Sequence, residues 1–145
     1  MTHGVDTDFL VAVEIRDHPF HRTADQLLTR LLRDGHDLAV APQTLAEFIH
    51  VVTDAKRMPQ PLSMSEAIQK AENWWHAVEV QRVLPDGQVV NDFLGWLASH
   101  HLGRKRLLDT MLAATFKQAG VMRLITNNER DCAVFGCFEI VTYGS

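Results

Sequence analysis

The sequence predicts an α/β protein, a three-layer α/β/α sandwich in which a mostly parallel central sheet lies between two layers of helices. Three observations predict this fold class. Short apolar runs that suit buried strands recur along the chain. Between them lie longer segments whose apolar residues repeat at helical spacing. The links between the two kinds of segment are short, as they are in folds built from parallel strands and crossover helices.

Five short segments are expected to form the sheet. They are a strand that ends at Asp6, then Asp37–Ala41, Val80–Leu84, Met122–Thr126 and Phe138–Tyr143. Each is bounded by turn residues or by the start of a helix. Because the carboxyl ends of parallel strands lie at one edge of a sheet, residues that follow different strands are expected to meet there.

Six segments are expected to be helical. They are the segment after Asp6, Phe20–Arg33, Pro42 to about Ala55, Ser63 to about Ala77, Val89–His101, and Leu107 to Gly120. Gly35 ends the second helix, and Pro42 suits the first turn of the third. Ser63 and Glu66 form a capping pattern for the fourth helix.

The later helices carry two further expectations. Val90, Phe93, Leu94 and Leu97 are expected to face the core from the helix Val89–His101. Leu102–Arg106 is interpreted as a basic loop, and Asn127–Asp131 as a turn.

Length and composition predict one domain over residues 1–145, which is large enough to bury a hydrophobic core. The formal net charge of −4 argues against a simple basic nucleic-acid binder, but not against a protein whose acids surround metal ions. The chain shows no signal peptide and no apolar run of about 20 residues that would span a bilayer. Cys132 and Cys137 are interpreted as two reduced thiols, which favours a cytoplasmic protein.

Asp109 is the first indication of a functional site. It lies near the start of the last long helix, on the same face as Leu112, Ala113 and Phe116. A carboxylate at the head of an inward-facing apolar stripe must be neutralised. A basic side chain, a helix N-terminus or a metal ion could each do so.

Other polar side chains are expected at the same edge of the sheet. Asp6 ends the first strand, and Glu47 lies about one turn into the helix that follows the second. Thr126, Asn128, Glu129 and Asp131 come after the fourth strand. Carboxylates gathered from distant parts of a chain repel one another unless a cation lies between them, and hard divalent cations prefer oxygen ligands. The sequence therefore predicts a divalent metal site.

Four segments, taken in order, resemble the acidic motifs of the PIN-domain ribonucleases, and in particular the VapC toxin branch of toxin–antitoxin pairs. They are Val5–Val11, Thr44–Phe48, Leu107–Thr115 and Ile125–Asp131. The resemblance extends over essentially the whole chain. It implies a PIN-like fold and metal-dependent endoribonuclease activity.

The resemblance also implies roles for particular residues. Asp6, Glu47 and Asp109 would be the core metal-binding acids, with Asp131 as the fourth, and the Thr126 hydroxyl would orient water or a ligand acid. The chain departs from the family pattern where Asp8 replaces the usual Asn or Ser, where Asn128 stands in place of an acid, and where Cys132 replaces an aromatic residue. The fourth ligand is therefore left open between Asp131, Asn128 and Glu129.

The expected cofactor is Mg²⁺, with Mn²⁺ as an alternative, and the expected partners are an RNA substrate, a VapB-like antitoxin and a second copy of the chain. Arg104–Arg106 is interpreted either as a solvated loop or as a contact for phosphate beside the metal. Trp74, Trp75 and Trp96 are expected in the core or on a self-association surface.

Two other functions are compatible with parts of the sequence. Asp6-Thr7-Asp8 matches the paired aspartates that begin haloacid-dehalogenase phosphatases, but no convincing lysine motif follows a later strand. The chain could also be a PIN-like module that binds RNA or a partner without cleaving RNA. Replacing Asp6 or Asp109 by Asn separates this alternative from a nuclease.

Overall fold

The computed structural model describes residues 1–144 and confirms the predicted α/β fold class. Its helices and strands alternate along the chain. In order they are β1 (Thr2–Val5), α1 (Thr7–Glu14), α2 (His21–Arg33), β2 (Asp37–Val40), α3 (Pro42–Val52), α4 (Met64–His76), β3 (Val80–Arg82), α5 (Gly87–Ser99), a 3₁₀ turn (Arg104–Arg106), α6 (Leu107–Gln118), β4 (Arg123–Ile125), α7 (Glu129–Ala133) and β5 (Glu139–Val141).

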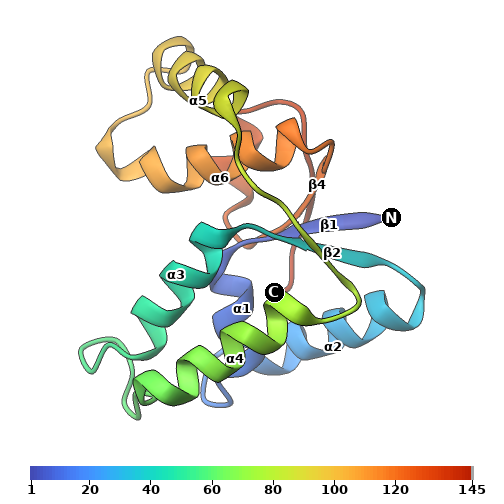
Figure 1. The fold of residues 1–145 in the computed structure, drawn as a ribbon, viewed down its shortest axis with the longest axis vertical. Coiled ribbons are helices and arrows are strands. Elements are labelled where there is room, and N and C mark those ends of the chain that lie inside the picture. Colours follow the sequence, from blue (N-terminus) through green and yellow to red (C-terminus); the bar gives the residue numbers. More distant parts are fainter. Residues whose placement is uncertain (145) are drawn as a thin grey trace.

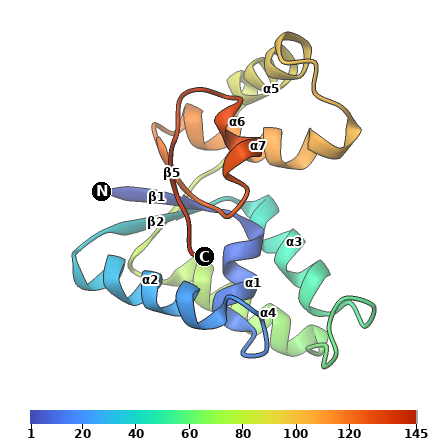
Figure 2. The same ribbon diagram turned by 180° about the vertical axis from the view of Figure 1, so that it is seen from behind.

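The five strands form one sheet in the order β3-β2-β1-β4-β5, and every pair is parallel. Helices α1 to α4 lie on one side of this sheet, and α5 and α6 lie on the other (Figure 1). Seen from behind, α7 lies beside α6 (Figure 2). Because all the strands run in the same direction, the residues that follow β1, β2 and β4 meet at a single edge of the sheet.

Local sequence signals set several of the helix boundaries. Pro42 occupies the first turn of α3, where its missing N–H costs nothing. Ser63 and Glu66 form the predicted capping box, with hydrogen bonds of 3.1 Å in both directions. Gly35 follows α2 with φ of +81°, a backbone conformation that glycine adopts without strain.

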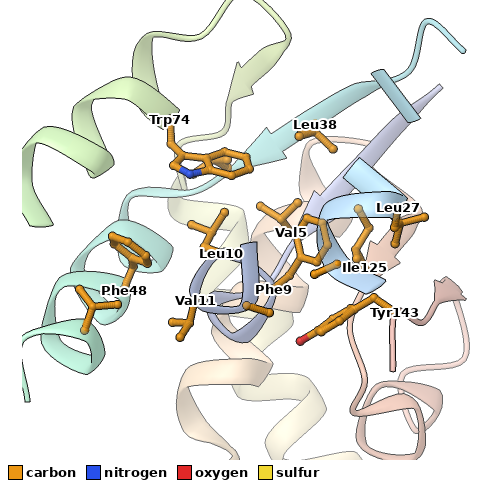
Figure 3. Close-up of a cluster of buried hydrophobic side chains, with 14 of the residues drawn as sticks. Val5, Phe9, Leu10, Val11, Leu27, Leu38, Phe48, Trp74, Ile125 and Tyr143 are labelled. Atoms are coloured by element: carbon orange, nitrogen blue, oxygen red, sulfur yellow. The ribbon is translucent and has the colours of Figure 1, made fainter. Parts of the chain in front are cut away.

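Hydrophobic side chains pack on both faces of the sheet. The larger cluster joins Val5 of β1 and Ile125 of β4 to Phe9 of α1, Phe48 of α3 and Trp74 of α4 (Figure 3). On the opposite face, Phe116 and Leu112 of α6 pack with Leu124 of β4 and with Ala39 and Ala41, from β2 and the residue after it. These two clusters fix α1, α3 and α6 against the strands, and these helices carry or adjoin the predicted acids.

Two expectations about local structure are wrong. Val90 and Leu94 of α5 are 46% and 55% exposed, whereas Val89 is fully buried and Phe93 and Leu97 are half-buried. The face of α5 that packs against the core is therefore offset by about one residue from the face predicted from the sequence. The segment Asn127–Asp131 is not simply a turn, because the Cys132 amide donates to the Asn128 carbonyl and starts the short helix α7.

Within residues 1–144, none of the helices combines the length and the apolar character that crossing a bilayer requires. Cys132 and Cys137 are both unpaired in this part of the chain, as expected.

The contact between Gly4 and α6 provides a test of this packing. A Cβ atom on Gly4 would lie 2.8 Å from two ring carbons of Phe116 and 3.0 Å from a methyl carbon of Leu124, and both side chains are buried. Gly4→Ala is therefore expected to destabilise the protein by about 1–3 kcal/mol through overpacking. The free energy of unfolding in urea measures this effect.

Gly95→Ala is the matched control. A Cβ atom at Gly95 meets nothing within 4 Å, so alanine there should stabilise α5 by up to about 1 kcal/mol. Equal effects of the two substitutions would contradict the tight contact at Gly4.

Candidate metal centre

A cavity of about 140 Å³ lies at the carboxyl edge of the sheet, where the sequence predicted that acids would meet. The residues that line it come from α1, α3, α6 and the segment after β4. They are Asp6, Thr7, Asp8, Glu47, Leu108, Asp109, Leu112 and Asn128. The three predicted core acids therefore share one cavity, although up to 103 positions separate them in the sequence, from 6 to 109.

Asp6 links the end of β1 to the start of α1. It is the N-cap of α1, and its Oδ1 accepts a hydrogen bond of 2.8 Å from the Phe9 amide. Burial raises the pKa of Asp6 to about 7, and the charges of Asp8 and Glu47 add to this effect. Hydrogen bonds from the Thr126 hydroxyl and the Phe9 amide act in the opposite direction. Asp6 therefore occupies a place where a negative charge is costly unless a cation compensates for it.

Glu47 reaches the cavity from the middle of α3. Its Oε2 accepts a hydrogen bond of 3.3 Å from the Thr7 hydroxyl, which joins α3 to the first turn of α1. Burial raises the pKa of Glu47, and the charges of Asp8 and Asp109 raise it further, while the hydrogen bond from Thr7 and the charge of His50 lower it. Two of the predicted acids thus have pKa values shifted upward at the same cavity.

Asp109 lies in the first turn of α6, at the rim of the cavity rather than inside the core. Its side chain is 42% exposed, whereas Leu112, Ala113 and Phe116, on the same face of α6, are buried. Arg106 Nε donates to Asp109 Oδ2 at 2.7 Å. Of the three means of neutralising Asp109 that the sequence allowed, this structure shows two, the basic side chain of Arg106 and the N-terminus of α6.

Some of the residues after β4 line a second, smaller cavity beside the first. Thr126 is buried, and its hydroxyl oxygen accepts a hydrogen bond of 3.0 Å from the Asn128 amide. Thr126, Asn128 and Cys132 line a smaller cavity of about 50 Å³ that Asp6 and Asp109 also border.

Asp131 does not line either cavity. Its Oδ1 lies 3.9 Å from Arg106 Nη1, and its side chain is half-exposed. Glu129 is exposed and borders neither cavity. The structure therefore brings together Asp6, Glu47, Asp109 and Asn128, with Thr126 beside them, and leaves Asp131 next to Arg106.

Two residues at the site were not singled out from the sequence. Thr7 is an ordinary first-turn residue of α1 by its sequence context, and no pattern indicated its hydrogen bond to Glu47. Arg106 was grouped with its exposed neighbours Arg104 and Lys105. Its position three residues before Asp109 places the two side chains on one helical face, and this spacing is a signal that could have found the ion pair.

The donor set fits a hard divalent cation, because the predicted ligands are carboxylate oxygens and burial raises the pKa of two of them. Among residues 1–144, no three His, Cys, Asp or Glu side chains are close enough to hold one ion as they stand. In this arrangement Asp6 accepts a hydrogen bond from the Phe9 amide, Glu47 accepts one from the Thr7 hydroxyl, and Asp109 accepts one from Arg106.

Residues 5–134 match the PIN domain. This chain belongs to the PIN domain family. The match begins at Val5, the last residue of β1, and it includes Asp6, α1, α3, α6 and the segment Thr126–Asp131, so all the predicted site residues lie within the matched region.

Individual relatives agree with the PIN assignment. The chain is similar to "Ribonuclease VapC24" of Mycobacterium tuberculosis, with 26% identity over 133 residues that cover 92% of this chain and 90% of the relative. Two solved structures have a similar fold. VapC20 of Mycobacterium tuberculosis, described as a sarcin-ricin loop-cleaving toxin, matches with a TM-score of 0.69 and 16% identity over 92% of this chain and 94% of that one. VapBC2 of Rickettsia felis, solved with a DNA fragment from its promoter, matches with a TM-score of 0.68 and 16% identity over 99% and 100%.

The raised pKa of Asp6 leads to a prediction about stability in the absence of divalent ions. A folded-state pKa of about 7, above the ordinary value of 3.8, favours folding below pH 3.8, and this advantage is lost as the pH rises through 7. Asp6→Asn is therefore expected to stabilise the metal-free PIN domain at pH 8 by about 1–3 kcal/mol, with little difference at pH 4. Asparagine can still cap α1, so the helix start is retained.

Urea unfolding in EDTA at the two pH values measures this difference. Asp25→Asn, at an exposed position of α2, is the control and should show no such pH dependence. A loss of stability in Asp6→Asn of the same size at pH 4 and pH 8 would contradict the costly buried charge.

Proposed function

We propose that this PIN domain is a divalent-metal-dependent endoribonuclease and the toxin of a VapBC-type toxin–antitoxin pair. The observation that carries the proposal is that Asp6, Glu47 and Asp109 line one cavity at the carboxyl edge of a parallel sheet in a PIN fold. The similarity to a relative named as a ribonuclease supports the same activity. Residues 1–145 are proposed to form a single PIN-like domain.

Asp6, Glu47 and Asp109 are the proposed metal ligands, and Asp131 remains the proposed fourth acid beside Arg106. Mg²⁺ is the proposed ion, with Mn²⁺ as the alternative, because both are hard cations that accept carboxylate oxygens and keep several waters. When bound, such an ion lowers the pKa of a coordinated water and stabilises the charge that builds up on the phosphate.

Other groups of the protein orient the carboxylates of the proposed metal ligands. Thr126 and the Phe9 amide hold the Asp6 carboxylate, and Thr7 holds that of Glu47. These hydrogen bonds fix two carboxylates on different helices relative to each other, which limits the rearrangement that catalysis requires. Arg104 and Lys105, exposed at the start of α6, are placed to contact RNA phosphates near the cavity.

The proposed partners are RNA, a VapB-like antitoxin and a second copy of the chain. The Rickettsia felis VapBC2 structure pairs a toxin of this fold with its antitoxin, which supports an antitoxin for this chain. A cavity with four carboxylates on its wall attracts arginine or lysine from such a partner. Exposed Val90 and Leu94 on α5 are suited to self-association. We propose a cytoplasmic location, which the proposed RNA substrate and antitoxin support.

The two alternative functions are less well supported. A phosphatase of the haloacid-dehalogenase type needs Asp6 as a nucleophile, but residues 5–134 match the PIN domain instead. A PIN-like module without catalytic activity would tolerate the loss of its acids. Substitutions at the cavity therefore distinguish this second alternative from a nuclease.

Asp6→Asn and Asp109→Asn are each expected to lower the rate of RNA cleavage by about a hundredfold or more, because each removes a charged group that would hold the ion. The assay measures cleavage of total cellular RNA with added Mg²⁺, and with EDTA as the metal-free arm. Asp25→Asn controls for a lost surface charge and should cleave like the wild type.

Cleavage that persists in EDTA would contradict the metal-dependent mechanism. Full cleavage by Asp6→Asn and Asp109→Asn would show that these acids do not form the site. An absence of cleavage by the wild type, together with unchanged growth inhibition by both variants in cells, would favour the binding module.

A further inference from the structure

Arg106 is held by several contacts within the protein, unlike a basic residue that is simply solvated. Its Nε donates to Asp109 Oδ2 at 2.7 Å, and its Nη2 donates to the Asp131 backbone carbonyl at 2.6 Å. Its guanidinium carbon lies 5.8 Å from the centre of the Phe135 ring. The side chain is only 21% exposed. Arg106 therefore joins α6 to α7 and is held in place from three directions.

The neighbouring basic residues do not share this arrangement. Arg104 and Lys105 are exposed in the same 3₁₀ turn, and neither forms an ion pair in residues 1–144. Within the same residues, Arg106 is the partner in both ion pairs made by predicted site acids, those with Asp109 and Asp131. The contrast sets Arg106 apart from a general basic surface.

The ion pair engages a carboxylate that is also a proposed metal ligand. Asp109 lines the cavity with Asp6, Asp8 and Glu47, and Arg106 provides the positive charge that compensates for Asp109 in the absence of an ion. A divalent cation at the cavity would bind the same carboxylate and repel the guanidinium. Each cation therefore weakens the attraction of the other to the Asp109 carboxylate.

We propose that Arg106 is a built-in counter-ion that competes with the divalent cation for Asp109, so that metal binding releases the Arg106–Asp109 ion pair. This inference rests on the proposed metal-dependent function and adds a regulatory step to the same site. The contacts with the Asp131 carbonyl and the Phe135 ring keep the guanidinium beside the cavity after Asp109 turns to the ion.

The wild-type protein provides the direct test. In an NMR titration of protein labelled with ¹⁵N at arginine, the Nε–H signal of Arg106 is expected to shift as Mg²⁺ is added and to exchange faster with water, because its hydrogen bond to Asp109 is lost. The Arg106→Lys spectrum assigns the signal by its absence. The Nε–H signal of Arg104 should not change. An Arg106 signal that stays fixed while Mg²⁺ saturates the site would overturn the proposal.

Calorimetric titration with Mn²⁺ tests the competition itself. Arg106→Gln is expected to bind Mn²⁺ about fivefold more tightly than the wild type, a change of the size expected for losing one partly exposed ion pair. Lys105→Gln removes the same charge from the adjacent exposed position and should change the affinity by less than about twofold. Arg106→Lys, which keeps the charge but not the planar fork of donors, should lie between the wild type and Arg106→Gln.

Weaker binding of Mn²⁺ by Arg106→Gln, or the same affinity as Lys105→Gln, would overturn the competition. The experiment also separates this proposal from the proposed function. If the wild type binds neither Mn²⁺ nor Mg²⁺, the metal-dependent function fails. If the wild type binds the ion and the Arg106–Asp109 ion pair persists, only the competition fails.

Discussion

Repulsion between carboxylates is the constraint on which the site depends. The parallel sheet directs the segments after β1, β2 and β4 to one edge, and these segments bring Asp6, Glu47 and Asp109 to a common cavity. Each acid is compensated locally: Asp6 by the N-terminus of α1, Glu47 by the Thr7 hydroxyl and Asp109 by Arg106. Burial, with a smaller contribution from the charges of neighbouring carboxylates, raises the pKa values of Asp6 and Glu47 even so. A fold that needed only stability would have no use for such a cluster.

The hydrophobic core provides the rigidity that keeps these charges together. Phe9 and Leu10 of α1 and Phe48 of α3 are fully buried on one face of the sheet (Figure 3). Phe116 of α6 packs on the opposite face. Each of these helices carries a predicted acid or starts directly after one. The energy gained by burying large side chains therefore offsets the cost of holding like charges near one another.

The sequence predicted the sheet, the order of the helices and the meeting of Asp6, Glu47 and Asp109, because these features depend on strong signals. Apolar periodicity marks the elements, and parallel strands fix where their ends lie. The rotation of α5 was not predicted, since Val89, Val90, Phe93 and Leu94 offer two overlapping apolar stripes and only packing against α6 decides between them. The contacts of Arg106 and Thr7 were not predicted either, because they depend on side-chain directions that residue order does not specify. Asp131 shows the same limit, since it lies in the short helix α7 and pairs with Arg106 instead of lining the cavity.

The two outermost strands set how this molecule can meet another copy of itself. β3 and β5 contain three residues each, and Arg82 and Glu139 place a charge on either border of the sheet. Because these edge strands are short and carry charges, they offer few unpaired backbone groups to a strand from another molecule. Growth by strand addition, the usual route to fibrous aggregates, is therefore disfavoured.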